Sequence, residues 1–203
     1  MKPIFIKDFF PAEILNLLHN YAILKYSNHK KYNPEKYAHS LIGEYADPLM
    51  ETILDMSTPV IEQNVQKKLW PTYSFLRIYD KCSDLPVHND RKGCEYTVAI
   101  CIGCDPIDKP YNIYIGKRDE NSDYKYRNNA GTIEPLKIEH RFSMLPNNAL
   151  LFQGQDEGDL HWREECTHDY YTTLFIHYVD QEGDQKEHKY DRRPMLCSPA
   201  VVV

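Results

Sequence analysis

The sequence from Tyr79 to Asp90, YDKCSDLPVHND, ends in two side chains that can bind a metal ion. His88 and Asp90 are separated by one residue, and alternate side chains of a strand lie on one face, so both can reach one ion from a strand end. Far downstream, Leu160-His161-Trp162-Arg163 supplies a second imidazole. Two imidazoles and one carboxylate are the ligand set that binds Fe(II) on one side and leaves other coordination positions open. We therefore predict that His88, Asp90 and His161 bind one metal ion. The alternative for His161 is a strand-end histidine bonded to the backbone.

The composition is that of an ordinary globular protein. The chain has 203 residues, 42% of them hydrophobic and 27% charged, which predicts one domain over residues 1–203. Its formal net charge of −6 disfavours nucleic acid as a partner. No apolar run is long enough to span a membrane, and charged residues follow Met1 too closely for a signal peptide. We therefore predict a cytoplasmic protein without a membrane partner.

Six cysteines show no pattern of a secreted disulfide framework, and we expect reduced thiols at Cys82, Cys94, Cys101, Cys104, Cys166 and Cys197. The pair Cys101 and Cys104 spells C-x-x-C, a motif that can bind zinc or carry redox chemistry. A second pair is missing, and Cys101 lies in an apolar run, where a free cysteine acts as a small hydrophobe. The structural role is favoured.

Three helices are expected in the N-terminal part of the chain. Pro11 can open the first helix, because the N–H that proline lacks is not needed there. The apolar stripe of this helix is formed by Ile14, Leu17, Leu18, Tyr21 and Ala22. Asp47-Pro48 starts a second helix that runs to Met56, and Thr58-Pro59 starts a third that runs to about Lys68.

Short strands follow the helices. The candidates are Tyr73–Tyr79, Val87–Asp90, Tyr96–Ile102, Tyr111–Ile115, Arg141–Leu145, Ala149–Phe152, Leu160–Arg163 and Tyr170–Val179, with an edge strand at Pro3–Ile6. A helical part at about 11–70 and a β core at about 73–180 indicate an α+β domain. We expect its core to be a two-sheet sandwich or jelly-roll barrel flanked by the helices. Residues 181–203 are expected to be a surface tail.

Residues 79–90 resemble the prolyl-4-hydroxylase-like branch of the Fe(II)/2-oxoglutarate-dependent dioxygenases. Tyr79, Leu85 and His88 match the strand end, apolar residue and first ligand of that family, whereas Cys82 replaces a usual glycine. The block Leu145–Phe152 resembles the turn and strand that precede the second histidine. The resemblance covers most of residues 3–179 and implies a double-stranded β-helix with iron at one open end.

The same resemblance implies a set of cofactors and a reaction. His88, Asp90 and His161 would bind Fe(II), 2-oxoglutarate would chelate the iron, and O₂ would take the last position. The products would be succinate, CO₂ and a substrate hydroxylated at a C–H bond. We therefore expect a hydroxylase.

The distal carboxylate of 2-oxoglutarate needs a cation. The family commonly places Arg or Lys at positions that correspond to residues 170–172, and none of these is basic here. Arg163 is the best replacement, because it shares a strand face with His161 and its guanidinium matches a carboxylate. The alternative for Arg163 is a salt bridge to Glu164, Glu165 or Asp90. Arg77 is the second candidate, and further hydrogen bonds are expected from the hydroxyls of Tyr79 and Thr172.

The remaining histidines receive simpler interpretations. His177 lies in an apolar strand and is expected to be a core residue or a support for the metal ligands. We expect solvated side chains at His140, His168 and His188, which sit among charged residues.

Two other functions remain open. One is a jelly-roll binding or scaffold module without activity, and the other is a cupin-like metalloenzyme that does not use 2-oxoglutarate. The substrate is open as well: a prolyl residue of a protein, a free amino acid or another small metabolite would fit. Candidates to line its approach are Ser27–Tyr45, read as a loop or lid, Gly116–Gly131 and Arg91.

Overall fold

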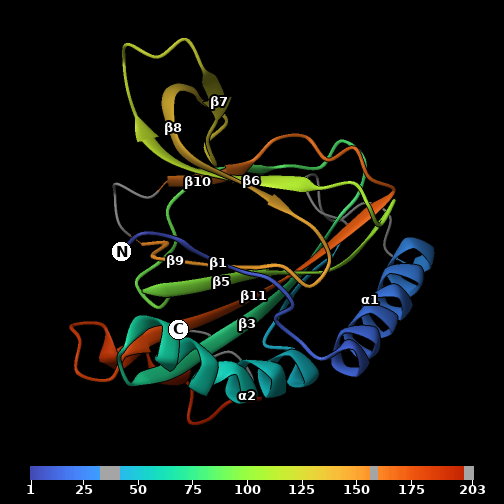
Figure 1. Cartoon of the computed structure of the whole chain (residues 1–203), viewed down its shortest axis with the longest axis vertical. Helices are drawn as coiled ribbons and strands as arrows, with labels where there is room; N and C mark the ends of the chain where they lie inside the picture. The colour runs from blue at the N-terminus through green and yellow to red at the C-terminus, as the bar shows by residue number, and fades with distance from the viewer. Residues whose placement is uncertain (33–41, 156–159, 199–203) are drawn as a thin grey trace.

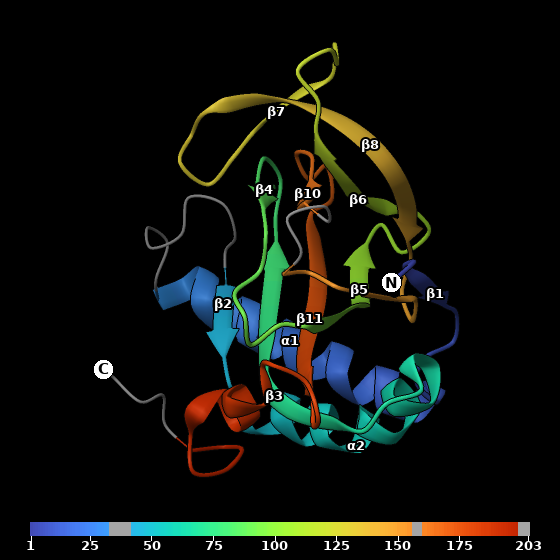
Figure 2. The same ribbon diagram turned by 90° about the vertical axis from the view of Figure 1, so that its left-hand side faces the viewer.

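Two antiparallel β-sheets face each other, and two α-helices cover the outer face of the larger sheet (Figure 1, Figure 2). The structure is a computed structural model that describes residues 1–32, 42–155 and 160–198. The helices are α1 (Ala12–Tyr32), α2 (Pro48–Val65) and the 3₁₀ helix η1 (Lys186–Arg192). The strands are β1 (Ile4–Ile6), β2 (Ile42–Tyr45), β3 (Leu69–Tyr79), β4 (Leu85–His88), β5 (Tyr96–Asp105), β6 (Tyr111–Arg118), β7 (Lys125–Arg127), β8 (Ile133–Met144), β9 (Ala149–Phe152), β10 (Leu160–Arg163) and β11 (Tyr170–Asp180).

The strand order is that of a double-stranded β-helix. The larger sheet has the order β1-β9-β5-β11-β3-β2, and the smaller sheet has the order β4-β10-β6-β8-β7. Apart from β6, β7 and β8, which follow one another in the smaller sheet, successive strands from β3 to β11 alternate between the two sheets, so residues distant in sequence meet between them. The predicted α+β class with a jelly-roll core flanked by N-terminal helices is confirmed.

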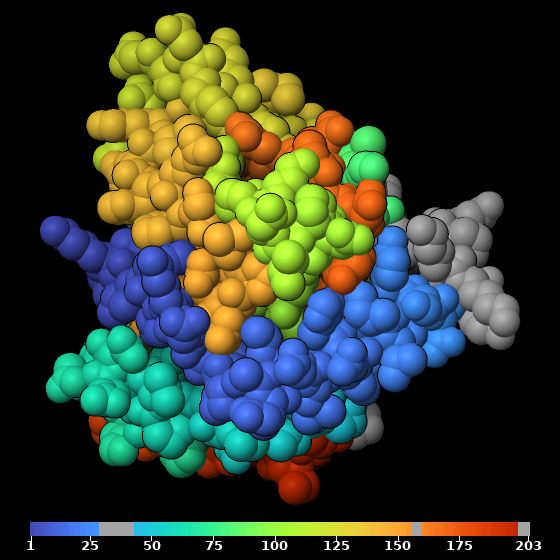
Figure 3. Space-filling model, turned by 45° about the vertical axis from the view of Figure 1, so that its right-hand side comes forward, coloured from blue at the N-terminus to red at the C-terminus, as the bar shows by residue number. Residues whose placement is uncertain are grey.

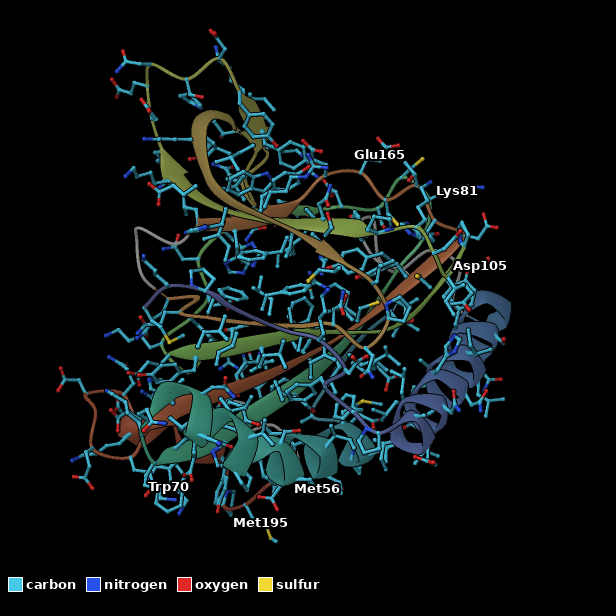
Figure 4. All side chains as sticks on the ribbon, in the orientation of Figure 1. Met56, Trp70, Lys81, Asp105, Glu165 and Met195 are labelled. Carbon is cyan, nitrogen blue, oxygen red and sulfur yellow. The ribbon has the colours of Figure 1, made fainter. Side chains whose placement is uncertain are left out.

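The side chains of the larger sheet alternate between two apolar cores. On β11, Leu174 and Ile176 point outward and pack with residues of α2. Tyr171 and Phe175 point inward and pack with residues of the smaller sheet, such as Ile113. Figure 4 shows side chains filling the space between the two layers. The residues that face this inner space are the ones available to a buried site.

Helix α1 begins after Pro11 as predicted, and it buries Leu18 and Ala22 completely. Leu17 was predicted in the buried stripe, but 51% of its surface is exposed. The helix also continues to Tyr32, into the segment predicted as a loop at Ser27–Tyr45. The end of that segment forms β2, and residues 33–41 lie outside the described part of the chain.

The second and third predicted helices are one helix, α2, with Pro59 inside it. Asp47 caps its start as predicted, accepting hydrogen bonds from the backbone N–H groups of Leu49 (3.0 Å) and Met50 (3.2 Å). Pro59 lies on the exposed side of the helix, where water can reach the carbonyl group that loses its N–H partner. An interior proline therefore did not end the helix.

Several strands differ from their predicted bounds. Strand β3 begins at Leu69 and includes Pro71, which lies opposite a register shift of β11 that accommodates the missing N–H. Strand β8 begins well before the predicted Arg141, because pairing with β6 compensates for its exposed and polar middle part. Strand β7 was not predicted. The segment from β6 to β8 stands out from the body at the top of Figure 3.

The C-terminal residues, predicted to form a surface tail, are anchored by a buried ion pair. The side chains of Arg193 and Glu51 are both fully buried and form a salt bridge. Arg193 also donates a hydrogen bond of 3.0 Å to the carbonyl oxygen of Thr72 in β3. The segment around η1 is therefore part of the packed structure.

No helix within the described residues has the length and apolar character needed to cross a membrane.

Candidate functional site

The three predicted metal ligands come together between the ends of the two sheets. His88 ends β4 and is the cross-strand partner of His161 on β10, and their ring centroids are 4.2 Å apart. The Nε2 atoms of His88 and His161 lie 3.7 Å and 3.6 Å from Oδ1 of Asp90. One donor atom from each residue therefore lies within 4.8 Å of the other two. This spacing and donor set suit a transition-metal ion bound on one side.

Neighbouring groups fix the orientation of His88. Its Nδ1 lies 2.7 Å from the carbonyl oxygen of Pro86, which can only accept a hydrogen bond. The proton of the neutral ring is therefore on Nδ1, and the lone pair of Nε2 faces Asp90 and His161. A backbone carbonyl on the second nitrogen is a common support for a metal-binding histidine.

Asp90 is held by its backbone and by a hydroxyl group. Its N–H donates to the carbonyl oxygen of Gly154 (2.8 Å), and its Oδ2 accepts a hydrogen bond from Thr97 (2.8 Å). The Thr97 oxygen also lies 3.1 Å from Nδ1 of His177. His177, predicted as a core or supporting residue, therefore contacts the group that orients Asp90. Thr97 and Gly154 were not singled out from the sequence, because their roles depend on contacts with distant strands.

The buried environment keeps the imidazoles of His88 and His177 neutral. Burial lowers the pKa of His88 to about 3, with a further decrease from His161. Burial likewise lowers the pKa of His177 to about 4. Burial alone would raise the pKa of Asp90, but the adjacent imidazoles and the Thr97 hydrogen bond lower it below its usual value. A neutral imidazole at His88 and an ionised carboxylate at Asp90 are the protonation states that binding of a metal ion requires of them.

A cavity of about 160 Å³ opens onto the three side chains. It is lined by Tyr73, Phe75, Arg77, Leu85, Phe175 and His177, besides His88, Asp90 and His161. One water needs only about 10–15 Å³ of such volume, so the cavity can hold a small organic molecule. Its walls combine the apolar side chains of Phe75, Leu85 and Phe175 with polar groups that can orient a ligand.

Arg163 points into the space between the sheets, among the rings of three tyrosines, and is completely buried. Its Nη1 donates to the carbonyl oxygen of Tyr111 at 2.9 Å. The guanidinium carbon lies 4.8 Å from the ring of Tyr111, 5.2 Å from that of Tyr171 and 5.8 Å from that of Tyr79. The alternative of a salt bridge finds no support, since no carboxylate among the described residues pairs with Arg163.

Three buried polar atoms of Arg163 and its neighbour Tyr79 have no hydrogen-bond partner among the described residues. They are Nε and Nη2 of Arg163 and the hydroxyl of Tyr79. A buried guanidinium without an anion and a buried hydroxyl without an acceptor are each costly. All three atoms can donate to a carboxylate, so the residues present fit the distal carboxylate of 2-oxoglutarate.

The structure brings Arg77 and Tyr79 to the inner face but not Thr172. On β3, Arg77 and Tyr79 share the inward face, and Arg77 lines the cavity. Thr172 lies opposite Ile78, which packs on the outer side against Ala22 of α1. Its neighbour Thr173 faces inward instead, with a buried hydroxyl that has no partner among the described residues. Alternation of side chains along the strand was predictable from the sequence, but which of its two faces points inward was not.

The histidines predicted to be solvated differ from one another. His140 is exposed. His168 is buried, and its Nε2 donates to the carbonyl oxygen of Lys109 at 2.8 Å, so the prediction for it was wrong. The side chain of His188 is only 12% exposed. Charged neighbours in sequence did not indicate solvent contact, because the chain folds back over both residues.

Comparison with solved structures shows which fold the chain shares. No family model matches the sequence, and no curated protein matches it. AviO1 from Streptomyces viridochromogenes Tue57 is 12% identical, with a TM-score of 0.59 over 89% of this chain and 90% of that one. The non-heme alpha ketoglutarate dependent carbocyclase SnoK from nogalamycin biosynthesis is 11% identical, with a TM-score of 0.58 over 88% and 79%. The viral collagen prolyl hydroxylase of Paramecium Bursaria Chlorella virus-1, in its 2OG complex, is 10% identical, with a TM-score of 0.55 over 88% and 96%. At the level of the fold, the resemblance to Fe(II)/2-oxoglutarate-dependent oxygenases is confirmed.

Proposed function

We propose that this protein is an Fe(II)- and 2-oxoglutarate-dependent oxygenase that hydroxylates a C–H bond of a small molecule or peptide. The observation that carries the proposal is the convergence of His88, Asp90 and His161, each with a donor atom within 4.8 Å of the others. The unpaired buried cation of Arg163, in the inner space lined by the same strands, supports 2-oxoglutarate as the co-substrate. Neither feature is expected of a scaffold module.

His88, Asp90 and His161 would hold the iron, and Arg163 with Tyr79 would hold the distal carboxylate of 2-oxoglutarate. Tyr171 stands at the strand position where the resemblance expects a basic residue, and the guanidinium of Arg163 lies 5.2 Å from its ring. The neighbouring strand β10 thus supplies the cation that β11 lacks. Iron and 2-oxoglutarate, when bound, supply the oxidation of the substrate by O₂, with release of succinate and CO₂.

The residues of this chain orient these groups and limit water. Thr97 holds one oxygen of Asp90, and the carbonyl of Pro86 keeps the lone pair of His88 directed at the metal site. Phe75 and Phe175 form apolar walls of the cavity. A site with fixed ligands and apolar walls favours oxidation of a positioned substrate over side reactions with water.

The test uses a signal that needs no known substrate. Under anaerobic conditions, Fe(II) with bound 2-oxoglutarate gives a weak visible charge-transfer band. We expect this band for the wild type, its loss in His88→Ala, and a requirement for at least about tenfold more 2-oxoglutarate in Arg163→Ala, since hydrogen bonds to charged groups contribute about 1.5–3 kcal/mol. Arg118→Ala, which removes a surface arginine, is the matched control.

The outcomes separate the alternatives. Metal binding without the band would favour a cupin-like metalloenzyme that does not use 2-oxoglutarate. Absence of metal binding would favour a binding module. An unchanged 2-oxoglutarate requirement in Arg163→Ala would remove Arg163 from the co-substrate site.

A further inference from the structure

Besides Arg163, the inner side of the sheets carries Arg77, and no carboxylate of the described residues pairs with it. It lines both the cavity at the metal ligands and an adjoining cavity of about 270 Å³. Its Nε is buried and has no hydrogen-bond partner among the described residues. Its guanidinium carbon lies 5.2 Å from the ring of Phe75 and 5.9 Å from that of Tyr79, which hold the side chain in place. Arg77 therefore presents unused donors to the cavity.

Arg77 and Arg163 occupy different positions around Tyr79. Arg163 is fully buried on β10 and bonded to backbone carbonyls, whereas Arg77 is half-buried on β3 beside His88. The fully buried cation suits the distal carboxylate of 2-oxoglutarate. Arg77, which is less buried and borders both cavities, is accessible to a molecule that enters after 2-oxoglutarate has bound.

In the site with iron and 2-oxoglutarate bound, the charges of the described residues leave Arg77 without a counter-ion. In the proposed complex, the charges of a ferrous ion and Arg163 are balanced by Asp90 and the dianion 2-oxoglutarate. Arg127, the other arginine of the adjoining cavity, is held by Asp84 through Nη2, 2.7 Å from both carboxylate oxygens. Within the part of the chain that the structure describes, the positive charge that remains next to the metal ligands is that of Arg77. A partly desolvated guanidinium binds a carboxylate well, because its donors form a planar fork.

We propose that Arg77 binds a carboxylate of the substrate, which assigns the substrate to the small carboxylic acids, a class that includes free amino acids. The proposal rests on the proposed oxygenase function. Phe75, Leu85 and Phe175 form apolar walls of the same cavity and match a hydrocarbon part bearing the C–H bond to be oxidised. A prolyl residue inside a protein chain has no free carboxylate for Arg77 to bind, so it fits the cavity less well than a free acid.

The experiment measures anion binding beside the metal without turnover. The protein is loaded with Mn(II) and 2-oxoglutarate, and the relaxation of acetate methyl protons is recorded by NMR. Paramagnetic enhancement falls steeply with distance, so acetate bound next to the metal dominates the signal. We expect enhancement in the wild type and in the surface control Arg118→Gln, a decrease of at least about fivefold in Arg77→Gln, and partial recovery in Arg77→Lys.

The protons of 2-oxoglutarate in the same samples separate the two proposals. If they show no enhancement in the wild type, the proposed function fails. Suppose that the 2-oxoglutarate protons show enhancement in the wild type. If the acetate protons then show none, or show equal enhancement in the wild type and in Arg77→Gln, only the assignment of Arg77 is overturned. A loss of 2-oxoglutarate binding of more than about tenfold in Arg77→Gln would place Arg77 at the co-substrate and would also overturn it.

Succinate formation by the Fe(II) enzyme gives an independent result. Free amino acids and their carboxamides are compared as matched pairs for stimulation of 2-oxoglutarate decarboxylation. Stimulation by acids but not by the paired amides is expected. Stimulation by a peptide with an internal proline, with no response to any free acid, contradicts the assignment.

Discussion

Asp191 accepts two hydrogen bonds from the guanidinium group of Arg91, Nη1 to Oδ1 at 2.6 Å and Nη2 to Oδ2 at 2.7 Å. Arg91 directly follows Asp90, and its guanidinium carbon lies 4.2 Å from the ring of Tyr73, which lines the cavity. Asp191 lies in a run of three residues with positive φ, Tyr190 to Arg192, a conformation that persists only when the surroundings enforce it. The C-terminal segment therefore supports the loop that carries Asp90.

Asp191→Asn should loosen this loop. Asparagine tolerates the positive φ, so the substitution removes mainly the charge-assisted pairing. The side chain of Arg91 is half exposed, and we expect a loss of only about 1–2 kcal/mol in the free energy of unfolding, together with weaker binding of Mn(II). Urea unfolding and metal titration measure both. Glu187→Gln, which removes an exposed ion pair in the same segment, should change neither; equal effects would argue against a specific role of Asp191.

Gly154→Ala should impair metal binding. A Cβ atom at this position would lie 2.2 Å from Oδ2 of Asp90 and 3.0 Å from the hydroxyl of Thr97. The carboxylate must move away, so we expect metal affinity to fall by about tenfold or more. In Gly93→Ala, by contrast, the nearest atoms lie 3.6 Å from the new Cβ, and metal binding should stay normal. Isothermal titration of both variants with the metal ion measures the affinities. A normal metal affinity in Gly154→Ala would show that the Asp90 carboxylate can move without loss of metal binding.

Thr97→Val should weaken metal binding while Thr97→Ser retains it. Valine keeps the shape but removes the hydroxyl that donates to Asp90 and contacts His177. Loss of a group that orients a metal ligand typically lowers metal affinity about 10–100-fold. Circular dichroism should show an unchanged fold in both variants. If serine fails to restore affinity, the methyl group of Thr97 matters more than its hydroxyl.

The stability of the metal-free protein should decrease as the pH falls from about 6.5 towards 4. The pKa of His177 is lowered to about 4 by burial, so between these pH values the unfolded chain binds a proton that the folded protein does not. Unfolding thus becomes more favourable with acid, by about 1 kcal/mol per pH unit for one such group. In urea unfolding at several pH values, His177→Gln should show a shallower dependence than the wild type. His140→Gln, at an exposed position, should keep the wild-type slope; a slope unchanged in His177→Gln would rule out this residue as the source.

The parts of the fold that depend on local signals were predictable from the sequence. Asp47-Pro48 begins a helix because the aspartate caps it and the proline needs no N–H there. The strands Tyr96–Ile102 and Tyr170–Val179 were predicted from apolar and aromatic residues, and both are central in the larger sheet. The N-terminal part of strand β8 and the unbroken helix α2 escaped prediction, because pairing with a partner strand and exposure of Pro59 overrode the local signals.

The sequence by itself determined the chemistry that the site can offer: two imidazoles, a carboxylate and nearby arginines on strands whose alternation places His88 with Asp90, and His161 with Arg163. Only the tertiary structure decided which face of each strand looks inward, bringing Thr97 and Thr173 to the inner side and Thr172 to the helices. It also decided that Arg163 is buried with no anion from the described residues, and that Asp191 near the C-terminus supports the loop that carries Asp90. The physical reason is that alternation along a strand is local, whereas register and burial depend on partner strands far away in the chain.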